Sequence, residues 1–205
     1  MKSRARETGR LRVLIANEEP ERLDLLAEAL FGLGHAALVR DVSLIPGPES
    51  DDPPAHVALV GRSSAAMPPL EVVRHLANAG SFPTVASLAA HDADYVFEAA
   101  RAGVYASLVG TDARDIQAAM DIAIERFRQF RMLQEAFARR ASLEQAKGIL
   151  MARHGVDQDE AFELLRSYAR RRSLRVTDIA AALLESHRLL APPAGETAAS
   201  HGMRS

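Results

Sequence analysis

The residues best suited to bind a partner in this chain are basic side chains in its second half. Residues 126–175 hold twelve Lys and Arg against six Asp and Glu, a net charge of +6, whereas residues 11–111 hold six against thirteen, a net charge of −7. A basic segment is the expected footprint of a polyanion, although Arg-rich helices can also be simply solvated. The opposite charges of the two segments indicate two different roles.

Groups that would carry catalysis or hold a metal are missing or scattered. The chain has no Cys, which excludes a disulfide framework, a Cys nucleophile and thiolate metal sites. Its histidines show no metal-ligand spacing; those considered are His35, His56, His75 and His91. No Gly-rich phosphate loop, nucleophile–base–acid set or Gly-x-Ser-x-Gly elbow is present. We therefore expect no enzyme, no catalytic residue, no metal site and no cofactor.

The acidic first half alternates short apolar runs with helical patterns. Apolar residues make up 48% of the chain, enough to build a core. The predicted strands are 11–16, 36–39, 56–60, 84–88 and 105–109, and helical spacing lies at 23–31, 70–77 and 94–102. Such alternation predicts a doubly wound, five-stranded parallel sheet covered by helices on both faces.

A long helix follows, because no Gly or Pro occurs between Asp112 and Gly148. Apolar residues step along it by alternating four and three positions, a heptad seam interrupted by Gln134. The seam predicts a coiled coil and a parallel homodimer, unless the helix packs only on its own domain. The predicted dimerisation residues are Ile116, Met120, Ala123, Phe127, Phe130 and Phe137.

Two shorter helices are predicted at the end of the chain. Gly155 interrupts the long helix, and Asp157 with Glu160 three residues later forms a capping box that starts a new one. Arg170–Arg172 would lie in its last turn, and an amphipathic helix begins near Val176. These segments predict a small, all-α, three-helix bundle.

The first half resembles the receiver domains of response regulators. It has five strands in βα alternation, acidic residues after the first strand, and the segment Ala99–Val104 before the fifth, which is typical of that family. A working receiver holds Mg²⁺ on an acidic pair after strand one. It phosphorylates an Asp at the end of strand three, next to a Thr or Ser ending strand four and a Lys ending strand five. The metal and the Lys neutralise the charge of the phosphoryl group.

The sequence departs from that receiver site at most positions. Asn17 and Glu18 stand at the acidic pair, and Gly61, Leu88 and Gly110 replace the acceptor Asp, the hydroxyl residue and the Lys. Glu18 and Glu19, which follows it, could still attract a cation weakly. The resemblance therefore implies a pseudo-receiver that signals through a regulatory protein, a sensor or a small molecule. The alternative is a purely structural domain.

The end of the chain resembles the ANTAR family of amidase and nitrate antitermination regulators. The resemblance covers about residues 130–190 and rests on four segments, Leu143–Met151, Ala161–Arg166, Tyr168–Ala169 and Thr177–Ala180. It implies that a dimer binds tandem stem-loops of nascent mRNA. The residues then expected to contact RNA are Gln145, Lys147, Gly148, Arg166, Tyr168, Arg170 and Arg171.

Gly148 would stand in mid-helix, where glycine costs about 1 kcal/mol relative to Ala. Either a close approach of RNA or tight helix–helix packing would explain it. The core of the bundle is expected at Ile149, Leu150, Phe162, Leu165 and Ile179.

The sequence thus predicts a cytoplasmic regulator of the two-component type. Its expected parts are a flexible tail at 1–10, a receiver-like domain at 11–111, a helical stalk at 112–141, an ANTAR domain at 142–190 and a disordered tail at 191–205. No apolar window approaches the ~18 residues of a membrane span, so no membrane partner is expected. Two other functions stay open, a DNA-binding response regulator and a coiled-coil adaptor that binds no nucleic acid.

Overall fold

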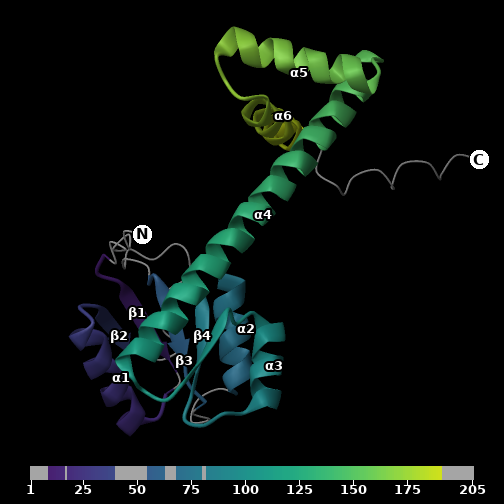
Figure 1. Cartoon of the computed structure of the whole chain (residues 1–205). Helices are drawn as coiled ribbons and strands as arrows, with labels where there is room; N and C mark the ends of the chain where they lie inside the picture. The colour runs from purple at the N-terminus through teal and green to yellow at the C-terminus, as the bar shows by residue number, and fades with distance from the viewer. Residues whose placement is uncertain (1–8, 17, 40–54, 63–67, 80–81, 191–205) are drawn as a thin grey trace, which may run out of the picture. The chain divides into compact units, whose positions relative to one another are not determined.

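The computed structural model describes residues 9–16, 18–39, 55–62, 68–79 and 82–190 (Figure 1). Asn17 and the two predicted tails, apart from Gly9 and Arg10, lie outside the described residues. The chain divides into two compact units, Met1–Arg131 and Met132–Ser205. Each unit is described by itself below.

Among the described residues, five strands and three helices precede the long helix, and two helices follow it. In chain order they are β1 (Arg12–Ala16), α1 (Pro20–Gly32), β2 (Ala36–Val39), β3 (Val57–Val60), α2 (Pro69–Ala79), β4 (Thr84–Leu88), α3 (Ala93–Ala102), β5 (Ala106–Val109), α4 (Ala113–His154), α5 (Gln158–Arg172) and α6 (Val176–Leu190). The strands form one parallel sheet in the order β2-β1-β3-β4-β5. The predicted fold class is confirmed.

Side chains of the strands alternate between two cores, as the period of a β-strand requires. On one face, Val13, Ile15 and Leu59 pack with residues of α1 and of the first turns of α4. On the other, Leu14 and Val60 pack with α2, and a neighbouring cluster joins β4 to α3. Figure 1 shows α2 and α3 together on one side of the sheet.

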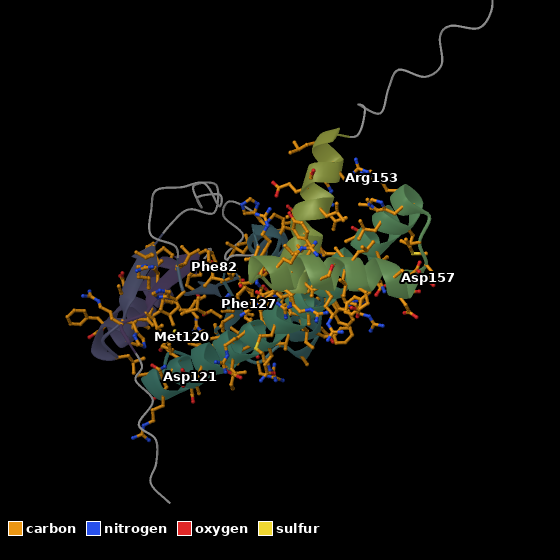
Figure 2. The ribbon with its side chains drawn as sticks, turned by 90° about the horizontal axis from the view of Figure 1, so that it is seen from above. Phe82, Met120, Asp121, Phe127, Arg153 and Asp157 are labelled. Atoms are coloured by element: carbon orange, nitrogen blue, oxygen red, sulfur yellow. The ribbon has the colours of Figure 1, made fainter. Side chains whose placement is uncertain are left out.

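The structure corrects the first half of the predicted dimer seam. Ile116, Met120 and Ala123 have no exposed surface, because they form the part of α4 that covers the sheet. Figure 2 labels Met120 and Phe127 on this helix. Phe127 packs its ring edge-on against Tyr105, with centroids 5.4 Å apart, and the Phe130 ring lies 6.2 Å from the same ring. A heptad pattern indicates only that one side of a helix is covered. In the first part of α4, the chain's own domain covers that side.

In the second unit, the last part of α4 packs with α5 and α6 around Ala146, Leu165 and Ala180 (Figure 1). Gly155 ends α4 with a φ of 65°, which explains why a glycine stands there. Asp157 then caps α5, and its carboxylate and that of Glu160 each accept a backbone N–H in the predicted capping box. None of the helices in the described part of the chain is long and apolar enough to cross a membrane.

Candidate functional site

The carboxyl ends of the parallel strands meet at one edge of the sheet, where a receiver would bind metal and phosphate. Glu18 follows β1, Gly61 follows β3, Ser87 and Leu88 end β4, and Gly110 follows β5. Arg22, in the first turn of α1, contacts three of these positions. The positively charged Arg22 side chain therefore lies at the centre of this edge, where a receiver would hold a metal cation.

The Arg22 guanidinium links β1, β4 and β5. Its Nε lies 3.3 Å from Glu18 Oε2, and its Nη2 donates to Ser87 Oγ at 3.1 Å and to the Gly110 carbonyl at 2.8 Å. The Arg22 side chain is 14% exposed and that of Glu18 is 3% exposed. Nε and Oε2 make no hydrogen bond with a described residue, so charge alone attracts them to each other. We call Glu18, Arg22, Ser87 and Gly110 the Arg22 cluster.

The other residues of the predicted phosphorylation site have structural roles in the described part of this edge. Gly61 is buried, and its N–H donates to the Ala16 carbonyl, which continues the ladder between β3 and β1. Leu88 is in the core. Gly110 has a φ of 81°, and its carbonyl accepts from Arg22. Arg22 was not predicted as part of this edge, although an acidic residue four positions before a basic one is the usual signal for an ion pair on a helix.

A second arginine, Arg62, makes contacts at the neighbouring part of this edge. Arg62 Nη1 lies 2.6 Å from Asp92 Oδ2, and its guanidinium stacks 4.4 Å from the centroid of the Tyr95 ring. Asp92 also caps α3, since its carboxylate accepts the Tyr95 N–H at 2.9 Å. That backbone hydrogen bond and then Arg62 lower the pKa of Asp92. Arg62, the residue after Gly61, is thus held at the start of α3 by its contacts with Asp92 and Tyr95.

On the helical bundle, the structure corrects the position predicted for Lys147. Its side chain was expected to face RNA, but the residue is only 7% exposed, and its Nζ lies 2.8 Å from Glu144 Oε2. Gln145 and Gly148 are exposed, as an RNA contact requires. Lys147 is one position from the buried Ala146, so its aliphatic stem is covered by the bundle while its ammonium group reaches a carboxylate.

The predicted residues on α5 divide between two sides of the helix. Arg166 and Arg170 both approach Glu163, at 3.0 and 3.6 Å. Tyr168 is two positions from each of these arginines, and residues so spaced do not face each other. The guanidinium carbons of Arg171 and Arg172 lie 5.6 and 5.4 Å from the centroid of the Tyr168 ring.

Arg172 and Arg175 were not predicted as RNA contacts, and both are exposed, with Arg172 beside this ring. The cluster of arginines around the end of α5 was the signal for them. We call Tyr168, Arg171 and Arg172 the Tyr168 face.

Comparisons with known proteins agree with both halves of this description. Residues 131–184 match the model of the ANTAR domain. NtrX from Brucella abortus has a similar fold, with 18% identity and a TM-score of 0.52 over 67% of this chain and 35% of that one. The signal receiver domain of an HD domain-containing protein from Pseudomonas fluorescens Pf-5 is 16% identical, with a TM-score of 0.50 over 60% of this chain and 93% of that one.

The chain thus spans about a third of the NtrX chain that it matches, and at such identities the likeness concerns the fold alone. No curated protein matches the chain. The two predicted resemblances are confirmed: the chain carries an ANTAR domain at residues 131–184, preceded by a domain with the fold of response-regulator receivers.

Proposed function

We propose that this protein is a transcription antitermination regulator that binds tandem RNA stem-loops as a dimer. The observation that carries the proposal is the ANTAR match over a bundle whose basic residues gather in the last turn of α5 and just before α6. Arg170, Arg171, Arg172 and Arg175 are all exposed there. Arginines that contact phosphates and aromatic rings that stack on unpaired bases are the usual means of reading RNA loops.

The Tyr168 face is the better candidate for the RNA surface on α5. Arg166 and Arg170 already have Glu163 as a partner, and binding RNA through them would bring a carboxylate close to phosphate. Arg171 and Arg172 have no carboxylate within ion-pair distance among the described residues, and the Tyr168 ring beside them is part exposed. An exposed ring flanked by guanidinium groups suits a base and its phosphates together.

Titration of the full chain with a tandem stem-loop RNA, and with duplex DNA of equal length, tests the proposal. We expect RNA to bind more tightly than DNA, with an affinity that falls steeply as salt rises. The double change Arg171→Ala and Arg172→Ala should weaken binding and make the log–log salt slope shallower by about 1.4, since each phosphate contact on a single strand contributes about 0.7. Arg74→Ala, an exposed arginine of α2, is the matched control.

Equal affinity for RNA and duplex DNA would favour a DNA-binding regulator, and no binding to either would favour a protein adaptor. In both cases the proposal is wrong. A folded double variant that binds RNA like the parent would reject the Tyr168 face alone.

We further propose that the receiver-like domain works without phosphorylation and contacts a regulatory partner. Gly61 stands where a carboxylate would be phosphorylated, and Arg22 already neutralises Glu18, the acidic residue described at the metal position. Incubation with acetyl phosphate and Mg²⁺ should therefore add no mass to the intact protein. An added phosphate that hydroxylamine removes, located within residues 11–120, would contradict this proposal.

A further inference from the structure

A groove lies on the ANTAR domain between the last turns of α4 and helix α6. It has a volume of about 760 Å³, and its lining is mostly apolar, with Ile149 of α4 and Leu183 and Leu184 of α6. Arg153, labelled in Figure 2 near the end of α4, and Arg188 of α6 also line it. No acidic side chain is among the described residues that line the groove.

Gly148 lines this groove on the α4 side and has no side chain that would fill it. A Cβ atom added there would meet no described atom within 4 Å, so packing inside the bundle does not require glycine. Its φ lies outside the left-handed region, so the backbone does not require glycine either. Glycine in mid-helix nevertheless costs about 1 kcal/mol relative to Ala. Of the two explanations for Gly148, the structure thus favours an external group that approaches the helix closely.

We infer that the α4–α6 groove receives an unpaired base of the RNA loop, with its flanking phosphates on Arg153 and Arg188. The inference rests on the proposed RNA-binding function and names the place where a loop base is held. An apolar lining suits the face of a base. Two arginines in a lining that holds no acidic side chain among its described residues suit the backbone of a polyanion better than they suit an apolar helix of another protein. Ile149, predicted as a core residue, lines the groove instead.

Substitutions at Gly148 test the groove without removing any charge. Gly148→Leu fills the opening and should weaken binding of the tandem stem-loop RNA by tenfold or more, and Gly148→Ala should weaken it by less. Neither variant should melt at a lower temperature, because Ala and Leu form helices better than Gly. The matched control is Gly32→Ala on α1, another helical glycine beside open space, which should bind RNA like the parent.

Three further measurements identify the occupant. An RNA that keeps both stems but has its loop bases removed as abasic sites should bind the parent and Gly148→Leu equally. Arg153→Ala should make the salt slope shallower by about 0.7, the contribution of one phosphate contact. Sedimentation of Gly148→Leu should give the same oligomeric state as the parent.

The outcomes separate this inference from the function on which it rests. If the parent binds no RNA, the proposed function fails and the groove assignment fails with it. If the parent binds RNA and folded Gly148→Leu binds it equally well, only the groove assignment fails. A change of oligomeric state in Gly148→Leu would instead make the groove an interface between two copies and overturn the inference. If Gly148→Leu does not fold, unchanged RNA affinity in Gly148→Ala overturns it.

Discussion

Replacing Arg22 by Met should lower the free energy of unfolding of the receiver-like domain by about 3 to 5 kcal/mol. Removing one partner of a buried ion pair has this cost because the other charge stays behind without compensation. Here Glu18 is the charge left behind, with a side chain only 3% exposed. The Gly110 carbonyl and the Ser87 hydroxyl would lose their donor as well.

Native-state hydrogen exchange measures this loss for the affected domain alone. The amides of Ile15 in β1 and Val85 in β4 report its opening, because both side chains are fully buried in the sheet core. Arg74→Met, on the exposed surface of α2, is the matched control and should change the free energy by less than about 0.5 kcal/mol.

A second variant tests the ion pair itself. Glu18→Leu combined with Arg22→Met should recover much of the loss, since replacing both members of a buried pair by apolar groups is often nearly neutral. An unchanged exchange rate in Arg22→Met, or a double variant less stable than the single one, would contradict the role given to Arg22.

The sequence predicts the elements of this chain well where local chemistry decides them. Asp157 and Glu160 form the predicted capping box, because both partners are three residues apart on one chain. The strands were predicted from short apolar runs, and β2 and β4 have the predicted bounds. Buried parallel strands read as apolar throughout, so their positions can be seen without knowledge of their neighbours.

The candidate sites depend on contacts across the fold, and there the sequence is less informative. Lys147 was assigned to RNA from the ANTAR resemblance, but its burial depends on how α4 packs with the rest of the bundle. Arg22 joins β1, β4 and β5, and its contacts with Ser87 and Gly110 cross 65 and 88 residues. No local sequence pattern indicates a contact between residues that are so far apart in the chain. Only the pair with Glu18 is local enough to have been predicted.

We propose the dimer in a narrower form than the sequence predicts. The predicted stalk, residues 112–141, contains a first part buried on the sheet and a second part that is exposed throughout from Phe130. Large apolar side chains stand in that second part, with Leu133 60% and Phe137 70% exposed. Leu133 is three positions from Phe130 and four from Phe137, so all three face the same side of α4. A second copy of this helix would cover them, as a coiled coil does.

The double change Leu133→Ser and Phe137→Ser should convert the dimer into a monomer. Burying one large apolar side chain contributes about 1.5 to 3 kcal/mol, and four are lost per dimer, so the dissociation constant should rise by at least about four decades. The monomer should stay folded, because both side chains are exposed within it.

Sedimentation at tens of micromolar measures the change. Phe31→Ser, which removes an 80% exposed phenylalanine from α1, should leave the dimer intact and is the matched control. A monomeric parent would reject the dimer. A double variant that stays dimeric would place the interface elsewhere on the chain, because an interface centred on Leu133 and Phe137 cannot lose four apolar side chains and keep its affinity.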